Sequence, residues 1–433
     1  MRTVEEHRDA ALALVAPLPP VRVPLGEALG LVAAEPVVSL VDLPGFDNSA
    51  MDGYAVRAAD VAGAGAGAGA GSGAGAGAGV DAGAGEADGT SVRLPVVADL
   101  AAGDPADAVH VGPGQAARIM TGAPVPAGAD TIVKVEDTDG GATDVEIHVG
   151  APAGTSIRRR GEDLAAGGEV LAPGAVLTPR RLALLAASGH GEVLCHPRPR
   201  VAVLSTGAEL VDPGKPLRPG QIHDSNSIML EAAVTAAGAR AAYRGHVGDH
   251  PDEVRALLAR LAGEVDVVIT SGGVSMGVHD VVKAVLREDR ELGAVDFVQV
   301  AMQPGKPQGL GVLHGVGGRG MPFFGLPGNP VSSYVSFEVF VRPVLRRLMG
   351  LEPAVPPTVR AALTAPLRSP AGRRQIARAV LTESETGWLA EPVAGQGSHF
   401  VADLAASTGL LLVPEEVTTL AAGAQLDAIV LDR

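Results

Sequence analysis

Between residues 200 and 350, short apolar runs of strand length alternate with longer segments of helical character. Strands that are separated by helix-length connections are typical of a parallel sheet whose two faces are covered by helices. We therefore predict an α/β domain in this region. Its predicted strands are Val201–Leu204, Val265–Thr270, Val295–Ala301 and Phe323–Leu326.

Two helices of this region can be placed from the residues at their ends. One starts at Asp224 or Ser225, whose side chains can accept hydrogen bonds from free backbone N–H groups, and it stops at Gly238. The other runs from about Pro330 to Leu348 and carries apolar residues on one side. The first of these helices connects two predicted strands, as a parallel sheet requires.

The regions on either side have other patterns, and 433 residues are too many for one hydrophobic core. Glu5–Val15 has helical spacing and is followed by several prolines. Ala62–Gly85 is almost pure alternation of alanine and glycine, which we interpret as a flexible surface insertion because it has no side chains to pack. Beyond Pro353 we expect a small β domain. Its predicted strands are Val359–Leu363, Gln375–Leu381, Gly409–Val413 and Ala428–Leu431.

Composition narrows the classes of function. The formal net charge of −15 opposes binding to nucleic acid or to an anionic membrane surface, so an anionic substrate would need a local basic cluster. Cys195 is the single cysteine, which excludes an intrachain disulfide and fits a reducing compartment. No apolar stretch approaches the roughly 20 residues that span a bilayer. We expect a soluble, cytoplasmic protein.

Small polar residues follow two of the predicted strands. The strings are Ser205-Thr206-Gly207 and Ser271-Gly272-Gly273-Val274-Ser275. Ligands of parallel sheets lie beyond the carboxyl ends of the strands, where small residues let backbone N–H groups approach phosphate oxygens. Neither string is a Walker loop or a Gly-x-Gly-x-x-Gly motif, which disfavours a standard nucleotide fold.

Three acidic residues lie close to these strings. Glu209, Asp249 and Asp280 could each cap a helix, but together at strand ends they suit Mg²⁺ held against substrate phosphates. Two proline-rich turns follow: Gln303 to Pro307, which contains Lys306, and Pro327-Gly328-Asn329-Pro330. Because the second turn opens a helix, its N–H groups and Lys306 suit an oxyanion.

Three residues of the N-terminal half are weaker candidates. Asp52 lies in a polar loop that also holds bulky apolar residues, so it fits a tight turn or a metal or proton-transfer site equally well. Thr121 follows a β-type run, where a lone threonine is usually a turn residue. Arg158 is one of three consecutive arginines, and we predict that it contacts phosphate.

These strings, from Pro44 to Ser398, resemble the MoeA family, whose eukaryotic relatives include the gephyrin E domain. The resemblance implies an α/β multidomain fold with an elongated protomer. It implies a linker domain (1–40 and 150–180), an inserted β-rich domain (41–149), a parallel-sheet pterin-binding α/β domain (181–350) and a C-terminal β-barrel domain (351–433). It also implies a homodimer in which Asp52 and Thr121 act on the partner's α/β domain.

The resemblance further implies that the chain inserts molybdenum from molybdate into adenylylated molybdopterin, with Mg²⁺, and releases AMP. The implied catalytic residues are Asp52, Thr121, Glu209, Asp249, Asp280 and Lys306, of which Asp249 and Asp280 hold the metal. The implied substrate-binding residues are Arg158, Pro327, Pro330, Arg373 and Ser398. The strand-end strings and the two turns add further substrate-binding candidates: Ser205, Thr206, Gly207, Ser271, Gly272, Gly273, Ser275, Gln303, Gly328 and Asn329. Gln303 stands where many relatives have lysine, which removes one cation from the oxyanion site.

Two other functions stay open on the sequence. A pterin-binding scaffold without turnover would keep the same binding loops, as the gephyrin relationship suggests. A molybdopterin adenylyltransferase has a similar α/β domain, although the inserted and terminal domains argue against it. The choice between molybdate and tungstate also stays open, as does contact with other proteins of molybdenum cofactor biosynthesis.

Overall fold

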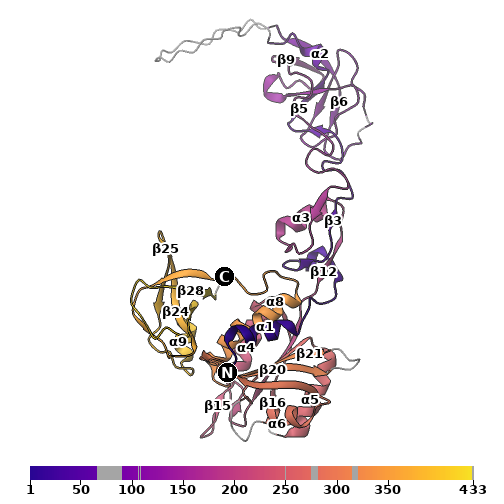
Figure 1. The fold of residues 1–433 in the computed structure, drawn as a ribbon. Coiled ribbons are helices and arrows are strands. Elements are labelled where there is room, and N and C mark those ends of the chain that lie inside the picture. Colours follow the sequence, from indigo (N-terminus) through magenta and orange to yellow (C-terminus); the bar gives the residue numbers. More distant parts are fainter. Residues whose placement is uncertain are drawn as a thin grey trace. The chain divides into compact units, whose positions relative to one another are not determined.

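The computed structural model describes residues 1–65, 90–105, 107, 109–248, 250–274, 281–314 and 320–431. Asp249, Ser275, Asp280 and nearly all of the Ala-Gly tract lie outside these residues. The chain forms two compact units (Figure 1). Unit 1 contains Met1–Glu35, Ala172–Pro179 and Glu192–Arg433, and unit 2 contains Pro36–Leu171 and Arg180–Gly191. Within the described ranges, no helix has the length and apolar character needed to cross a membrane.

A six-stranded sheet forms the α/β part of unit 1 (Figure 1). Its strands, in order across the sheet, are β16 (Arg240–Val247), β13 (Arg200–Thr206), β17 (Val267–Ser271), β21 (Gly320–Leu326), β20 (Pro307–His314) and β18 (Gly293–Gln299). The first four strands are parallel, as predicted.

The other edge of this sheet corrects the prediction for Val295–Ala301. That run forms most of β18, which pairs antiparallel with β20, and β20 pairs antiparallel with β21. Only five residues separate β20 from β21, which is too few for a crossover helix. Strand β20 was not predicted, because Gly309 and Gly311 interrupt its apolar pattern.

Helices cover both faces of this sheet and explain its continuous apolar runs. Alternate residues of each strand belong to different cores: Val203 and Ile269 pack with α4 and α7, whereas Leu204 and Val268 pack with α5 and α6. The helices are α4 (Asn226–Ala236), α5 (Pro251–Glu264), α6 (Val281–Glu288), α7 (Pro330–Ser336) and α8 (Arg342–Leu348).

The predicted helices are confirmed, with one irregularity. Ser225 precedes α4, Asp224 Oδ1 accepts a hydrogen bond from Ser227 N at 3.0 Å, and Gly238 follows the helix with φ +87°. The helix from Pro330 to Leu348 contains a π-helical segment, Phe337–Val341, between α7 and α8. Pro343 lies just after this segment and could not follow a regular α-helical turn, because it lacks an N–H group and its ring would meet an earlier carbonyl.

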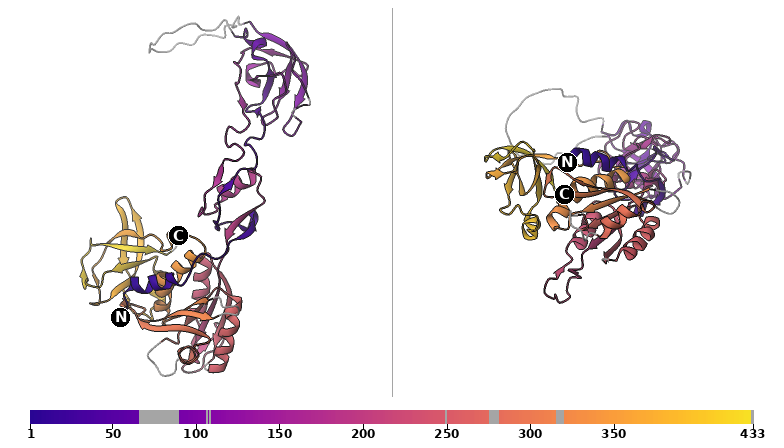
Figure 2. Two further views of the ribbon diagram at one scale, coloured as in Figure 1. Left: turned by 45° about the vertical axis from the view of Figure 1, so that its right-hand side comes forward. Right: turned by 60° about the horizontal axis from the view of Figure 1, so that its bottom comes forward.

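A closed five-stranded barrel forms the C-terminal part of unit 1. Its strands are β24 (Arg374–Ser384), β25 (Gly387–Pro392), β22 (Val359–Leu363), β28 (Gln425–Val430) and β26 (Gly409–Val413), and β26 pairs back to β24. The predicted strands are confirmed. The N-terminal helix α1 (Val4–Ala13) packs between this barrel and the helices of the α/β part (Figure 2).

Unit 2 is built on a five-stranded sheet with hydrophobic side chains on both faces. Its strands, in order across the sheet, are β8 (Thr131–Lys134), β5 (Gly53–Val56), β7 (Ala116–Ile119), β6 (Val92–Leu100) and β9 (Asp144–Ile147). The remaining elements of the unit are short. They are α2 (Ala58–Val61), η2 (Val135–Asp137), β3 (Val37–Val38), β4 (Asn48–Ser49), β10 (Ile157–Arg158), β11 (Glu169–Leu171) and α3, whose range Pro179–Ala187 begins on the last residue of a unit 1 segment.

Candidate active site

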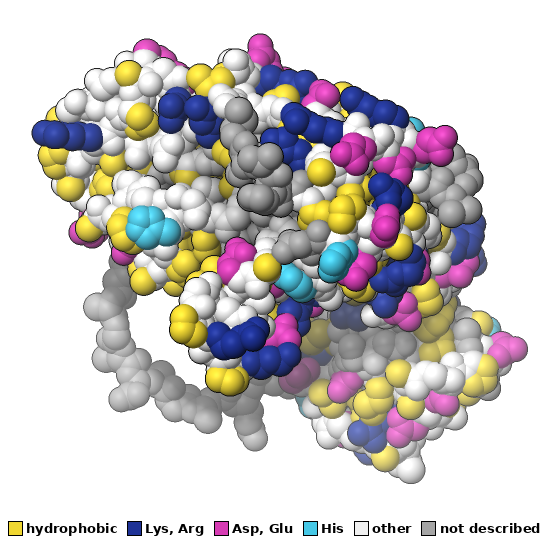
Figure 3. All heavy atoms as spheres, turned by 90° about the horizontal axis from the view of Figure 1, so that it is seen from below, with side chains coloured by type: hydrophobic (Ala, Val, Ile, Leu, Met, Phe, Trp, Pro, Cys, Tyr) yellow, Lys and Arg dark blue, Asp and Glu magenta, His cyan; other side chains and the backbone are white. Residues whose placement is uncertain are grey.

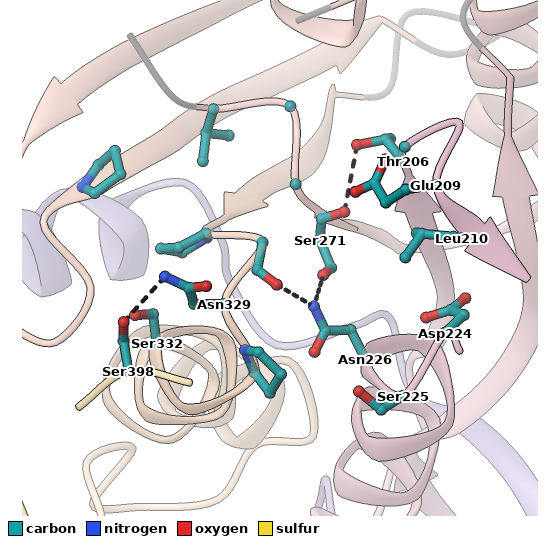
Figure 4. A pocket seen from close by; sticks show the side chains of 18 of the residues that line it. Thr206, Glu209, Leu210, Asp224, Ser225, Asn226, Ser271, Asn329, Ser332 and Ser398 are labelled. Atoms are coloured by element: carbon teal, nitrogen blue, oxygen red, sulfur yellow. Dashed lines mark hydrogen bonds between the residues drawn. The ribbon is translucent and has the colours of Figure 1, made fainter. Parts of the chain in front are cut away.

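A cavity of about 1120 Å³ lies at the carboxyl edge of the parallel strands of unit 1 (Figure 4). The loops after β13, β17 and β21 line it, together with the turn after β19 (Met302–Gln303) and a segment of the barrel. Most of the predicted substrate-binding residues in these segments line the cavity. Ser205 does not, and Ser275 lies outside the described residues. Those that line it are Thr206, Gly207, Ser271, Gly272, Gly273, Gln303, Pro327, Gly328, Asn329, Pro330 and Ser398.

The loops after β13 and β17 form one half of the cavity, which we call the strand-end half. Gly272 has φ +90°, and a Cβ added there would lie 2.7 Å from Thr206 Oγ1. Thr206 Oγ1 donates a hydrogen bond to the Ser271 carbonyl at 3.4 Å. Glycine at position 272 therefore allows two loops to approach more closely than a side chain would permit.

Two polar residues of this half were not predicted as site residues. Asp224 and Asn226 line the cavity and are 7% and 9% exposed. Ser205 is fully buried and donates a hydrogen bond to Asp224 Oδ2, so it supports Asp224 from behind the cavity. The string Asp224-Ser225-Asn226 was predicted only as the start of a helix. One residue is enough to cap a helix, so three polar residues in a row were a signal for a site.

The other half of the cavity, which we call the turn half, combines three segments. Gln303 ends β19, Lys306 lies in the turn after it, and Asn329 comes from the turn between β21 and α7. Asn329 Nδ2 donates a hydrogen bond to Ser398 Oγ at 3.0 Å (Figure 4), which ties the barrel to this turn. Among the described lining residues, Lys306 is the one lysine or arginine.

A buried arginine of the barrel holds the segment that carries Ser398. Arg378 lies in β24, is 1% exposed and donates hydrogen bonds to the carbonyls of Gly395, Gly397 and Phe400. Burial lowers the pKa of the Arg378 guanidinium from its ordinary value. Arg378 was not predicted, and the predicted Arg373 does not line the cavity. An arginine in the middle of a predicted apolar strand was the available signal.

The surface around the α/β part carries charges of both signs. In the view from below, Lys and Arg side chains lie among Asp and Glu side chains (Figure 3). Arg244 pairs with Glu231 of α4 at 2.8 Å, and Arg255 of α5 pairs with Asp289 at 2.9 Å. These surface cations already have acidic partners, so an anionic substrate in the cavity depends on the charges that line it.

Three predicted residues lie in unit 2, whereas the cavity belongs to unit 1. The structure brings two of them together: Asp52 Oδ1 accepts hydrogen bonds from Thr121 N at 2.6 Å and Thr121 Oγ1 at 2.8 Å. These bonds, first the one from the backbone N–H, lower the pKa of the Asp52 carboxyl from its usual value. Arg158 is exposed in β10, where it lies opposite Asn48 of β4 in an antiparallel strand pair.

The predicted metal ligands cannot be located from the described residues, because Asp249 and Asp280 lie outside them. Glu209 and Asp224 are the carboxylates of the described cavity lining. In the described part of the chain, no three His, Cys, Asp or Glu side chains gather closely enough to hold a metal ion by themselves.

Three family models match consecutive parts of the chain. The model described as the MoeA N-terminal region (domain I and II) matches residues 2–189. One described as a probable molybdopterin binding domain matches residues 202–347, which contain the strand-end half of the cavity. The model described as the MoeA C-terminal region (domain IV) matches residues 360–431, which contain Arg378 and Ser398.

Individual relatives match over nearly the whole length. Molybdopterin molybdenumtransferase 2 of Mycobacterium tuberculosis is 47% identical over 429 residues, which are 98% of each chain. The molybdopterin molybdenumtransferase of Haemophilus influenzae is 36% identical over 92% of this chain and 91% of its own. A crystal structure of the molybdopterin biosynthesis protein MoeA from Pyrococcus horikoshii matches with a TM-score of 0.77 and 31% identity, covering 100% of this chain and 99% of that one. The chain therefore belongs to the MoeA family of molybdopterin molybdenumtransferases, enzymes of molybdenum cofactor biosynthesis.

Proposed function

We propose that this enzyme transfers molybdenum from molybdate to adenylylated molybdopterin and releases AMP. The observation that carries the proposal is a single cavity with two different halves. The strand-end half offers glycine-rich loops beside polar side chains, and the turn half offers Lys306 with neutral hydrogen-bond donors. Such a cavity suits a substrate with phosphates next to a small oxyanion.

In the strand-end half, the adenylylated pterin would lie across Thr206, Gly207 and the loop that begins at Ser271. Small residues at Gly272 and Gly273 leave the backbone open to phosphate oxygens. Ser275 extends this loop in the sequence, and Arg158 is proposed as a further phosphate contact. These residues would bind and orient the phosphoanhydride.

In the turn half, molybdate would lie between Lys306, Pro327 and Ser398. Lys306 supplies the charge, while the side chain of Gln303 supplies a hydrogen bond. The sequence also favoured the N–H groups that open the Pro330 helix, but Val331 N–H already donates to the Ser398 carbonyl and Ser333 N–H to the Asn329 carbonyl. Arg373 was predicted to bind the oxyanion, but the proposal rests on the residues that line the cavity. Arg378 keeps Ser398 in place through three backbone carbonyls.

Mg²⁺ fits the donors at the strand-end half, because this ion takes one or two carboxylates together with phosphate oxygens and water. Glu209 is a cavity carboxylate of the required type, and we propose Asp249 and Asp280 as the metal ligands. When bound, the ion would draw electron density from the bridging phosphates. Glu209 would orient a water whose oxygen attacks the adenylyl phosphorus, so that the anhydride bond breaks and AMP leaves. The two dithiolene sulfurs would replace one oxygen of molybdate, which leaves as water with the two thiol protons.

We further propose that the enzyme acts as a homodimer. The partner subunit's Asp52 and Thr121 would then complete the cavity. Within this chain the pair is already assembled, because Thr121 donates two hydrogen bonds to one oxygen of Asp52 and these bonds lower the pKa of its exposed carboxyl.

The test is an AMP-release assay with purified protein, adenylylated molybdopterin, molybdate and Mg²⁺. We expect AMP to appear only when molybdate is present, and a parallel assay with tungstate measures the choice of oxyanion. Retention of the pterin without molybdate-dependent AMP release would contradict the proposal and support a scaffold. Formation of adenylylated molybdopterin from molybdopterin and ATP would support an adenylyltransferase instead.

A further inference from the structure

Asn226 lies between the two halves of the cavity and is bonded to both. Its Nδ2 donates one hydrogen bond to Ser271 Oγ and one to the Gly328 carbonyl, each at 2.6 Å (Figure 4). Ser271 ends β17, and Gly328 follows β21, the neighbouring parallel strand. One side-chain amide therefore connects the loop of the strand-end half to the turn that opens α7.

The orientation of this amide is determined by its partners. The Gly328 carbonyl can only accept a hydrogen bond, so the NH₂ group of Asn226 must face the two loops. Both N–H bonds of that group are then in use, and Oδ1 is buried without a hydrogen-bond partner. A buried acceptor left without a partner costs about 1–3 kcal/mol, whereas the flipped amide would place Oδ1 against the Gly328 carbonyl, which cannot donate.

The backbone of Asn226 is held as firmly as its side chain. It is the first residue of α4, whose Leu230 and Val234 are fully buried in the core beneath the sheet. The two loops also touch each other, because a Cβ added at Gly328 would lie 3.6 Å from the Gly272 Cα. The amide thus joins two loops that pack without side chains between them.

We infer that Asn226 is a positioning residue that sets the distance between the strand-end half and the turn half of the cavity. This inference rests on the proposed function, in which each half holds one substrate. Each half has its own binding groups, so each substrate should still bind when Asn226 is changed. Their relative placement should be lost, and a misplacement of about 1 Å can slow a reaction by about a hundredfold.

The test compares Asn226→Ala and Asn226→Asp with the wild-type enzyme. We expect the Kd of each substrate, measured alone, to change by less than about threefold, because its own loop is intact. We expect kcat per bound pterin to fall by about tenfold or more, because the reacting groups no longer meet. Thr235→Ala is the matched control, since it removes a hydroxyl from the exposed end of the same helix.

The pH profile separates positioning from a general structural role. In Asn226→Asp the ionised carboxylate faces the Gly328 carbonyl without a proton to donate, whereas the protonated carboxyl can donate one. The activity of Asn226→Asp relative to wild type should therefore rise as the pH falls. Asn226→Ala cannot regain the bond, so its relative activity should not follow this trend.

A binding measurement without Mg²⁺ tests the inference independently of turnover. Saturating molybdate should tighten pterin binding to the wild-type protein, and Asn226→Ala should lose this coupling. Unchanged kcat with intact coupling in both variants would overturn the inference, as would weakening of both substrates measured alone. A wild-type enzyme that releases no AMP overturns the proposed function instead, and the coupling measurement then decides the role of Asn226.

Discussion

The two halves of the cavity are positioned by different means. In the strand-end half, the loops follow directly from parallel strands, so the register of β13 and β17 places Ser205 opposite Ser271 and brings the loops together. In the turn half, three segments from distant parts of the chain meet: Asn329 bonds Ser398, 69 residues away, Val331 N donates to the Ser398 carbonyl at 3.2 Å, and Gln303 pairs with Gln375 of β24. The register of neighbouring parallel strands therefore defines one half, whereas side-chain bonds and short backbone contacts between distant segments define the other.

The largest effect is expected from removing the single cation of the described cavity lining. Lys306→Ala should lower AMP release at limiting molybdate by about a hundredfold, because the turn half then has only neutral donors. The Kd for the adenylylated pterin should stay within about twofold. Titration of molybdate in the AMP-release assay measures the first quantity and calorimetry the second. Lys215→Ala, which removes an exposed lysine paired with Asp212, is the control.

An equal loss of pterin affinity in Lys306→Ala would show that the two halves share their charges, and the comparison would then fail.

A smaller effect is expected when the support of the turn half is changed. Arg378→Lys keeps the charge but cannot reach three carbonyls, so Ser398 should move and the KM for molybdate should rise by about thirtyfold, roughly 2 kcal/mol. Pterin binding reports whether the variant is folded. Arg360→Lys tests an exposed arginine of the same barrel. If Arg378→Lys leaves the KM for molybdate unchanged, Ser398 is not held by this arginine.

Gly272→Ala should have the reverse selectivity: it disturbs the strand-end half and should weaken pterin binding instead of molybdate binding. The added Cβ would lie 2.7 Å from Thr206 Oγ1 and would also require a left-handed backbone, at a cost of about 1–2 kcal/mol. We expect pterin affinity to fall about tenfold and the KM for molybdate to change little. Gly423→Ala separates the two causes, because Gly423 also has a positive φ, +87°, but has open space around it. Equal effects of both substitutions would mean that loop approach is unimportant.

The same contrast explains which parts of the molecule could be predicted from sequence. Strands, helix ends and the strand-end loops were found because their signals are local: apolar period, caps and glycine. The contacts of Asn226 and Arg378 were not found, because their partners lie 17 to 102 residues away and nothing in the chain identifies them. The sequence marks each residue as unusual for its place but does not say what it binds. The antiparallel edge was missed for a related reason, since pairing direction depends on the neighbouring strand and not on the run itself.

The smallest effect is expected at Gln303, where a cation can be added to the turn half. Gln303→Lys places a second ammonium group at the cavity lining near Lys306. A partly solvated charge pair contributes about 1 kcal/mol, so the KM for molybdate should fall about fivefold and become more sensitive to salt. Gln425→Lys adds the same charge to an exposed strand of the barrel and should change neither quantity. If Gln303→Lys instead tightens pterin binding and leaves molybdate unaffected, this residue serves the strand-end half, and the boundary between the halves lies beyond it.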